Sequence, residues 1–221
     1  MMAVALVAAR DESGRVGATV AALSRFVDEV VVIDDGSTDG TGEEASRAGA
    51  RVVRLSKSLG KGRALEAGIS SVASSPEVWL LADGDLGETA GLLQPLLEAV
   101  DYGRADLVIA VLPKQGGGFG MVKRFAGGAI KRLSGFEAQE PLSGQRAVRA
   151  DVLAACRPIA AGFGVETAMT IDAARLGFKI LEMQTDIHHR PSKRDIGGFT
   201  HRGRQGWDIL RAVVARAAGV R

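Results

Sequence analysis

The chain is poor in cysteine, in aromatic residues, in net charge and in long apolar runs. Its single cysteine, Cys156, excludes an internal disulfide and a zinc site built from several cysteines, and we expect it to be a buried core thiol. Aromatic residues make up 5% of the 221 residues, and a formal charge of +2 gives no overall field that favours nucleic acid. No apolar run approaches the roughly 20 residues that a membrane-spanning helix needs, and the opening AVALVAA lacks the basic flank of a signal peptide. These absences predict a cytoplasmic globular protein with no nucleic-acid partner.

Charge is nevertheless uneven along the chain. From Lys179 to the end, nine Lys and Arg residues stand against four acidic ones. Such a segment can meet phosphate groups or anionic lipid headgroups, or it can be a solvated basic face. We therefore expect this basic C-terminal segment to allow peripheral contact with the inner face of a membrane, while the oligomeric state stays open.

Strand-like apolar runs alternate with helical segments, most regularly in the first half. Predicted strands occupy residues 3–8, 29–33, 51–55, 78–82, 107–112 and 179–188. Predicted helices occupy residues 15–26, 43–48, 61–72, 89–100, 121–133, 165–176 and 207–218, the last with Trp207, Leu210, Val214 and Ala217 aligned. Alternation of this kind requires right-handed βαβ crossovers. It predicts one α/β domain over residues 1–221, with a mainly parallel central sheet flanked by helices.

Acidic pairs follow two of these strands. Asp34 and Asp35 end the second strand, and Asp83-Gly84-Asp85 follows the fourth. Ligands of open α/β sheets bind in the crevice beyond the carboxyl ends of the strands, and carboxylates are preferred ligands of Mg²⁺ and Mn²⁺. Asp83 and Asp85 can therefore share one cation with a diphosphate, while Gly84 allows close backbone approach. A ligand-free Asp-Gly-Asp turn is the alternative.

The second strand end also suits a nucleotide base. A carboxylate at Asp35 can accept the imide N–H of uracil or the N1–H of guanine, with help from the hydroxyl of Ser37. The alternative is helix capping by Ser37, Thr38 or Asp39, all of which are good cap residues. Base binding by Asp35 and helix capping can both occur, because capping needs only one of these three residues.

Four segments in this order resemble glycosyltransferase family 2 proteins: ARDE after the first strand, VIDDGSTDGT after the second, GKGRALEAG, and ADGDL after the fourth. The resemblance implies the GT-A fold, a Rossmann-like nucleotide-diphospho-sugar transferase fold, and a metal-dependent hexosyltransferase using Mg²⁺ or Mn²⁺. It implies a nucleotide-sugar-binding half over residues 1–112 and an acceptor-binding half over residues 113–221. The residues implied to bind the nucleoside-diphosphate sugar are Ala9, Arg10, Glu12, Asp35, Ser37, Lys61, Asp83 and Gly84.

The second half resembles the glucosyl-3-phosphoglycerate synthases and their retaining relatives, through GGGFGMVKR, PLSGQRA, GFGVETAM and HHR. This resemblance implies catalytic roles for Asp85, Glu166 and Lys123. It also implies an acceptor site that includes Gly118, Ser143 and Gly144, and a metal site made by Asp83, Asp85 and His189, or His188 if the register slips by one. The alternatives are a solvated strand end for the His pair, a surface turn for the glycine run, and a helix-dipole role for Glu166.

The acceptor and the reaction class leave further alternatives. Phe119 stands where the phosphoglycerate enzymes carry an Arg, so a bidentate grip on a carboxylate or phosphate is lost there, although Lys123 and Arg124 follow closely. We expect a phosphorylated acceptor, either a small molecule such as phosphoglycerate or a lipid phosphate such as polyprenyl phosphate. The alternative functions are a sugar-phosphate nucleotidyltransferase and a non-catalytic nucleotide-sugar binding module.

Overall fold

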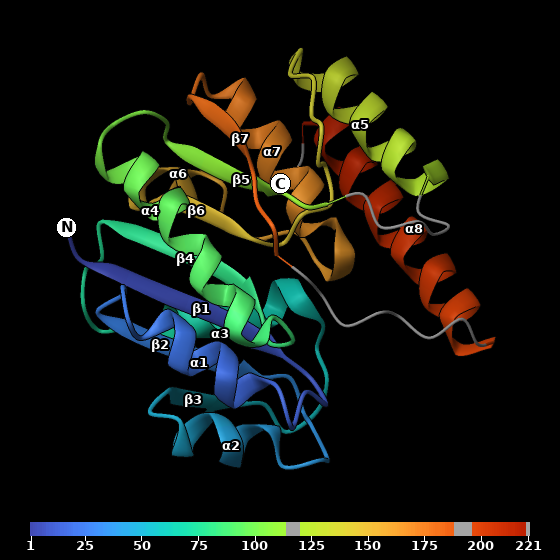
Figure 1. Cartoon of the computed structure of the whole chain (residues 1–221). Coiled ribbons are helices and arrows are strands. Elements are labelled where there is room, and N and C mark those ends of the chain that lie inside the picture. The colour runs from blue at the N-terminus through green and yellow to red at the C-terminus, as the bar shows by residue number, and fades with distance from the viewer. Residues whose placement is uncertain (114–119, 188–195, 220–221) are drawn as a thin grey trace.

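A seven-stranded sheet runs through the middle of the molecule, in the order β3-β2-β1-β4-β6-β5-β7 (Figure 1). The computed structural model describes residues 1–113, 120–187 and 196–219. The strands are β1 (Ala3–Ala9), β2 (Glu29–Asp34), β3 (Arg51–Arg54), β4 (Val78–Asp83), β5 (Leu107–Val111), β6 (Arg146–Arg149) and β7 (Ile180–Gln184). Only β6 runs antiparallel to its neighbours, β4 and β5, among the strands of the described residues. The predicted mainly parallel α/β sheet is therefore confirmed.

Helices cover both faces of this sheet. They are α1 (Val16–Leu23), α2 (Thr41–Arg47), α3 (Lys61–Ser71), η1 (Gly87–Leu93), α4 (Gln94–Asp101), α5 (Gly120–Ser134), α6 (Ala150–Ala155), η2 (Gly162–Gly164), α7 (Val165–Arg175) and α8 (Ile196–Ala217). The side chains of β1 alternate between two cores. Ala5 and Val7 pack with α1 and α4, whereas Val4 and Leu6 pack with α3, α6 and α7.

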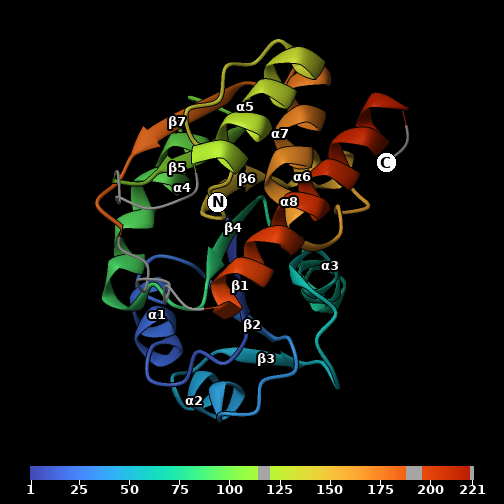
Figure 2. The same cartoon turned by 90° about the vertical axis from the view of Figure 1, so that its right-hand side faces the viewer.

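Helices α5 and α8 form an additional layer outside α7. Both pack against α7 and against each other, and Figures 1 and 2 show them side by side at the margin of the molecule. On α8 the buried residues are Ile209, Ala212 and Arg216. The aligned residues Trp207, Leu210, Val214 and Ala217 instead form its exposed face.

Several element boundaries differ from the predicted ones. Strand β6 lies in a stretch for which no strand is predicted, because its four residues pair only with distant β4 and β5. The predicted helix over 89–100 is divided into η1 and α4, with Pro95 at the start of α4, where proline is tolerated and disfavours helix before it. Helix α8 begins at Ile196, well before the predicted residue 207.

Two further predictions concern the burial of Cys156 and the presence of a membrane-spanning helix. Cys156 is buried at the end of α6, as predicted for a core thiol. Within the described ranges, no helix has both the length and the apolar character required to cross a bilayer.

Candidate active site

The carboxyl ends of β2, β1 and β4 meet at one edge of the sheet. The parallel register pairs Ala9 with Asp34 and Ala8 with Asp83, so both acidic strand ends lie level with the end of β1. The loops that follow these strands therefore converge, as the crevice rule for open α/β sheets requires. The predicted gathering of the two acidic segments at this edge is confirmed.

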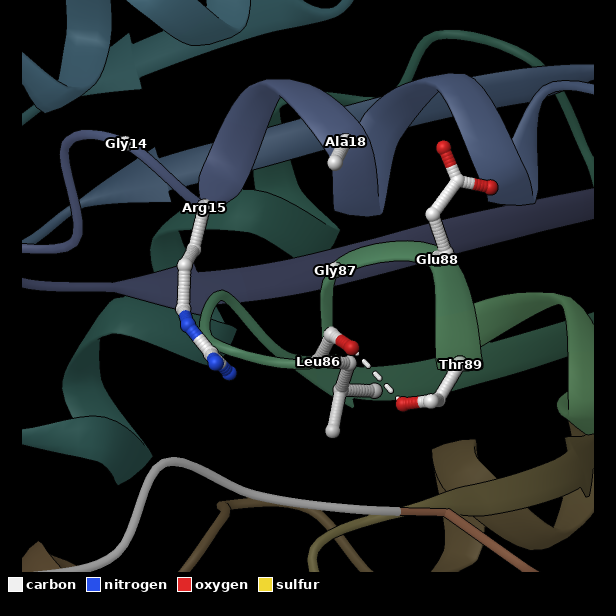
Figure 3. Close-up of a pocket in the computed structure, with 7 residues that line it drawn as sticks. All are labelled: Gly14, Arg15, Ala18, Leu86, Gly87, Glu88 and Thr89. Atoms are coloured by element: carbon white, nitrogen blue, oxygen red, sulfur yellow. Dashed lines mark hydrogen bonds between the residues drawn. The ribbon is translucent and has the colours of Figure 1, made fainter.

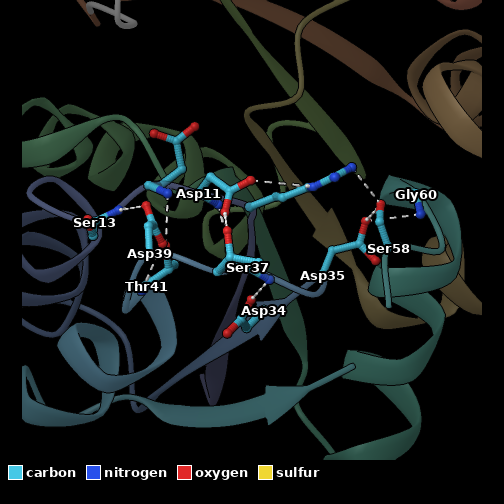
Figure 4. A network of polar contacts seen from close by, with 12 residues as sticks. Asp11, Ser13, Asp34, Asp35, Ser37, Asp39, Thr41, Ser58 and Gly60 are labelled. Carbon is cyan, nitrogen blue, oxygen red and sulfur yellow. Dashed lines mark hydrogen bonds and ion pairs between the residues drawn. The ribbon is translucent and has the colours of Figure 1, made fainter. Parts of the chain in front are cut away.

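The loops after β1 and β2 are tied together by side-chain to backbone hydrogen bonds (Figure 4). The Asp11 N–H donates to Ser37 Oγ at 2.9 Å, and the Thr38 N–H donates to Asp11 Oδ1 at 2.9 Å. The Ser13 N–H donates to Asp39 Oδ2 at 3.0 Å. Asp11 adopts a φ of 54°, the left-handed conformation that Asp tolerates better than most residues. Together these contacts make the two loops one preformed rim.

Two acids of this rim hold their own loop in shape. Asp34 is buried, and its Oδ1 accepts the Ser37 N–H at 2.8 Å. Asp39 Oδ1 accepts the Thr41 N–H at 3.1 Å and the Thr41 hydroxyl at 2.5 Å. The hydrogen bond from the Thr41 hydroxyl is the main cause that holds the pKa of Asp39 below its ordinary value, against slight desolvation. Asp39 thus accepts the N–H of Thr41, the first residue of α2. The N-cap position itself is Gly40, which makes no side-chain cap hydrogen bond, so none of Ser37, Thr38 and Asp39 occupies it.

Asp35 accepts hydrogen bonds from the turn that precedes α3. Its Oδ1 accepts the Leu59 N–H at 2.7 Å, and its Oδ2 accepts the Ser58 hydroxyl at 2.7 Å and the Gly60 N–H at 3.0 Å. Arg10 Nη1 donates to the same Ser58 Oγ at 2.9 Å (Figure 4). Asp35 therefore stabilises the turn over residues 58–60, and its predicted contact with the base stays a prediction.

Lys61, the first residue of α3, lies between two carboxylates. Its Nζ is 2.6 Å from Asp83 Oδ1 and 2.8 Å from Glu166 Oε1. On the other side of Asp83, Gln145 Nε2 donates to Oδ2 at 2.8 Å. Burial by itself would lower the pKa of Lys61, but the charges of Asp83 and Glu166 outweigh it and raise that pKa. Lys61 therefore remains a cation throughout the neutral range.

Glycines allow these segments to approach so closely. A Cβ at Gly144 would overlap Lys61 Nζ and would lie 2.9 Å from Asp83 Oδ2. A Cβ at Gly62 would overlap the carbonyl oxygen of Ala160. Gly144, predicted as an acceptor-binding residue, thus lies against the Lys61–Asp83 pair itself.

A buried arginine supports the turn that carries Gln145. Arg146 Nε donates to the Ser143 carbonyl at 2.8 Å, and Nη1 donates to Thr170 Oγ1 at 2.9 Å. Its Nη2 has no hydrogen-bond partner among the residues that the structure describes. Burial lowers the pKa of Arg146 to about 10, although the charge of Glu166 opposes this shift. The predicted acceptor residue Ser143 is buried here and contributes its carbonyl oxygen to this support.

Helix α1 holds the Asp83-Gly84-Asp85 turn from the other side. Arg15 Nη1 donates to the Asp85 carbonyl at 2.8 Å, and Thr19 Oγ1 donates to the Gly84 carbonyl at 2.9 Å. Four residues of this neighbourhood were not predicted from the sequence: Arg15, Thr19, Gln145 and Arg146. The last two directly follow the SG of the PLSGQRA segment, which is the signal that could have identified them.

The two carboxylates of this turn suit a hard divalent cation. Among the described residues, no three His, Cys, Asp or Glu side chains lie close enough together to hold a metal ion. His189, implied as the third ligand, its neighbour His188, and Gly118 and Phe119 of the glycine run all lie outside the described residues.

Lys123, predicted to be catalytic, lies on α5 and pairs with Glu140. Its Nζ is 2.6 Å from Glu140 Oε2, and the Glu140 N–H donates to Glu182 Oε1 at 2.7 Å. This chain of contacts ties α5 to the segment that leads into Ser143. Lys61 rather than Lys123 is the lysine that contacts Asp83 and Glu166.

A hollow of about 290 Å³ lies beside the acidic turn. Figure 3 shows its lining, which comes from the start of α1 and from η1 and is made of Gly14, Arg15, Ala18, Leu86, Gly87, Glu88 and Thr89. Arg15 lines this hollow and also supports the acidic turn, whereas Lys61 does not line the hollow. We therefore assign the candidate site to the Lys61 cluster and the rim around it.

Comparisons with known proteins agree with this geometry. The sequence profile of glycosyl transferase family 2 matches residues 5–156. Glycosyltransferase AglJ of Haloferax volcanii is 34% identical over 174 residues, which cover 75% of this chain and 56% of that protein. Glucosyl-3-phosphoglycerate synthase of Mycobacterium tuberculosis is 33% identical over 177 residues, which cover 69% of this chain and 53% of that protein. The chain spans about half the length of these relatives.

Solved structures show the same likeness in three dimensions. The Mycobacterium tuberculosis glucosyl-3-phosphoglycerate synthase in complex with Mg²⁺ and uridine diphosphate superposes with a TM-score of 0.82 at 27% identity, covering 100% of this chain and 80% of that one. Its complex with Mn²⁺, uridine-diphosphate-glucose and phosphoglyceric acid gives a TM-score of 0.81 at 25% identity, with the same coverage. The predicted GT-A fold is confirmed.

Proposed function

Because the chain belongs to glycosyl transferase family 2, we propose that it is a metal-dependent hexosyltransferase acting on a nucleoside-diphosphate sugar. The observation that carries this proposal is the placement of Lys61 between Asp83 and Glu166 at the carboxyl edge of the sheet. Family membership favours transfer over the two alternatives, a nucleotidyltransferase and a non-catalytic binding module. The ammonium group of Lys61 suits the negative charge of a diphosphate, and the acidic side chains beside it suit the divalent cation that would accompany the diphosphate.

We propose a uridine diphosphate sugar as the donor. The structurally similar synthase binds uridine diphosphate and uridine-diphosphate-glucose, which supports this choice over a guanosine donor. The rim formed by residues 10–13, 35–41 and 58–60 would receive the nucleoside. Asp35 is already oriented by the turn over residues 58–60, and Ser37 offers a hydroxyl whose proton can be donated.

The acidic turn would hold Mg²⁺ or Mn²⁺. We assign Asp83 and Asp85 as its ligands, with His189 as the predicted third ligand; Asp83 would bind the cation while its oxygens also accept hydrogen bonds from Lys61 and Gln145. A divalent cation bound there would neutralise negative charge on the departing nucleoside diphosphate. Arg15 and Thr19 keep the turn in place through its backbone carbonyls.

Lys61 and Glu166 form one ion pair, and each would contact a different part of the donor. Lys61 stays protonated and can offer positive charge to the diphosphate. Glu166 is buried at the start of α7, with Oε1 directed by Lys61, so its other oxygen can accept a hydrogen bond from a sugar hydroxyl. These assignments make Lys61 a binding residue and Glu166 a residue that positions the sugar.

For the acceptor we propose a phosphorylated molecule. The similar synthase binds phosphoglyceric acid, and the acceptor half of this chain contains Lys123 and Arg124 at the start of α5. Lys123 would have to exchange its partner Glu140 for the acceptor phosphate. Phosphoglycerate and a lipid phosphate both present the phosphate group that this exchange requires.

Nucleotide binding tests the proposal. Thermal unfolding with uridine diphosphate and guanosine diphosphate, each with and without Mn²⁺, should show stabilisation by uridine diphosphate only when the metal is present. At a ligand concentration of 100 Kd the gain is about 2.7 kcal/mol. The Asp85→Asn variant should lose this gain, because one metal-binding carboxylate is removed.

The matched control is Asp101→Asn, an exposed carboxylate at the end of α4, which should keep the full effect. Release of uridine diphosphate from uridine-diphosphate-glucose in the presence of 3-phosphoglycerate then tests transfer itself. Nucleotide binding of equal strength without metal, retained by Asp85→Asn, would exclude the proposed metal site.

A further inference from the structure

The outer helices α5 and α8 expose large apolar side chains to solvent. On α8, Trp207 is 60% exposed, Val214 56% and Leu210 38%. On α5, Met121 is 75% exposed and Phe125 44%. Scattered exposed apolar residues are common on globular proteins, but three at i, i+3 and i+7 on one helix form a continuous stripe.

Helix α8 carries apolar side chains on two opposite sides. The side that faces the protein carries Ile209, Ala212 and the buried ion pair of Arg216 with Asp172, while Trp207, Leu210 and Val214 face outward. Burial of these three side chains in the fold would have been favourable. Their outward placement therefore indicates a second apolar environment outside the described fold.

Basic residues surround this apolar surface. Arg124 and Arg132 are exposed on α5, and Arg211 is exposed beside Leu210 on α8. In sequence, the two helices together contain eight Lys and Arg but one acidic residue, Asp208. Because the whole chain has 28 basic and 26 acidic residues, the rest of it holds 20 basic and 25 acidic residues. This count includes Arg216, which is buried against Asp172, and Lys123 and Lys131, which pair with Glu140 and Glu137. Among the side chains that the structure describes, the positive charge of the outer face therefore comes mainly from Arg124, Arg132 and Arg211.

We propose that the outer face of α5 and α8, defined by Met121, Arg124, Phe125, Trp207, Leu210, Arg211 and Val214, docks on an anionic lipid bilayer. Tryptophan and arginine are suited to the boundary between headgroups and acyl chains, because each combines an apolar body with a polar end. Helices with an apolar face and a basic rim lie in the plane of this boundary. Figure 2 shows both helices on the same side of the molecule, so one bilayer surface can contact both.

Charge favours a bilayer over a second copy of the chain. A symmetric dimer would bring the same basic patch of both subunits into one interface, so the positive charges of Arg124 and Arg211 from the two copies would add there. Anionic headgroups instead complement these side chains, at about fivefold in affinity for each Lys or Arg near the surface.

The docking face is structurally connected to the candidate active site. Helix α8 packs against η2, and η2 leads directly into α7, whose second residue is Glu166. A bilayer under α5 and α8 would therefore hold the site near the membrane surface, where a lipid phosphate is available as acceptor. Docking itself requires neither donor nor acceptor, so its test is separate from the test of the proposed function.

Vesicle co-sedimentation with the full chain tests docking. Vesicles of equimolar phosphatidylcholine and phosphatidylglycerol should bind the protein, whereas vesicles of phosphatidylcholine alone should bind it poorly, and high salt should weaken binding. The emission of Trp207 should shift to shorter wavelength on binding, against a constant contribution from buried Trp79.

Two variants of the outer face sharpen the experiment. Trp207→Ser should weaken vesicle binding about tenfold, and the combined Arg124→Glu and Arg211→Glu variant should remove the preference for phosphatidylglycerol. The control is Tyr102→Ser, which removes an aromatic side chain that is 74% exposed directly after α4. Figure 1 shows α4 at the left of the molecule, and α5 and α8 at the right. Tyr102→Ser should bind like the parent protein.

Three results would overturn the proposal. They are the absence of binding to vesicles with phosphatidylglycerol, binding by Trp207→Ser equal to that of Tyr102→Ser, and a dimer in sedimentation equilibrium that Trp207→Ser converts to a monomer. The last result would assign the face to a second copy of the chain. All of these positions are exposed, and far-ultraviolet circular dichroism confirms folding of each variant.

Discussion

Two groups of charged side chains each include one acidic residue of α7, Asp172 or Glu166, and they differ in how completely they are paired. Asp172 and Arg216 form a closed pair, in which Arg216 Nε and Nη2 lie 3.1 and 2.8 Å from Asp172 Oδ2 and both side chains are 4% exposed. In the Lys61 cluster, one ammonium group serves Asp83 and Glu166, and the side chain of Asp83 is 30% exposed.

The difference separates a structural ion pair from a binding site. Asp172 and Arg216 satisfy each other, and they join α7 to α8 away from the carboxyl edge of the sheet. The Lys61 cluster lies at the carboxyl edge of the sheet, and part of its charge remains accessible. Buried charge alone therefore does not indicate function, whereas its placement in the crevice does.

The largest expected effect is on stability, from breaking the closed pair. Asp172→Asn leaves the Arg216 guanidinium buried without a counterion, and the free energy of unfolding should fall by about 3–5 kcal/mol. Urea unfolding measures the loss. Removing both charges, by Asp172→Leu with Arg216→Met, should recover most of it, because no unpaired charge remains. A loss below about 1 kcal/mol in the single variant, typical of a surface pair, would show that the pair is not closed.

A smaller effect, on ligand affinity, is expected in the Lys61 cluster. Lys61→Met should weaken binding of uridine diphosphate with Mn²⁺ by about 1.5–3 kcal/mol, or about ten- to hundredfold in Kd, because a charged hydrogen-bond donor is lost. Isothermal titration calorimetry measures this change. The control is Lys57→Met, which removes an exposed lysine in the loop that leads into α3, and it should bind normally. If Lys61→Met instead lowers stability as Asp172→Asn does and keeps its affinity, the cluster is structural.

The smallest effect should come from Gln145. Gln145→Ala removes one neutral donor from Asp83 Oδ2, which is worth about 1 kcal/mol, or about fivefold in nucleotide affinity. The same calorimetric titration measures it, and exposed Gln139→Ala serves as the control. Gln145→Glu should be worse than Gln145→Ala, since a second carboxylate would face Asp83. Equal affinities for all three variants would remove Gln145 from the site.

The first half of the molecule followed from local sequence patterns. Apolar runs that end in acids predicted β2 and β4 and the placement of Asp34 and Asp83 at the same edge of the sheet. Such predictions succeed because strand identity and parallel connection depend on short-range periodicity and on the handedness of crossovers. The motif GKG also identified Lys61 through its resemblance to a family.

The second half was less predictable. Strand β6 is four residues long and pairs antiparallel with β4 and β5, and no local periodicity marks so short a strand. Gln145 and Arg146 acquire their partners only because this strand inserts beside β4. The sequence predicted Ser143 and Gly144 as acceptor residues, but their packing against Arg146 and Lys61 depends on the same insertion.

The sequence by itself determined the parallel α/β framework and the acids at the strand ends, because residue periodicity and turn chemistry act over a few neighbouring positions. Only the tertiary structure decided that Lys61 joins Asp83 to Glu166, and that the stripe of Trp207, Leu210 and Val214 faces outward. Both depend on how α3, α7 and α8 pack across long sequence separations. A periodic stripe defines a helix face, but the direction of that face is set by the element against which the helix packs.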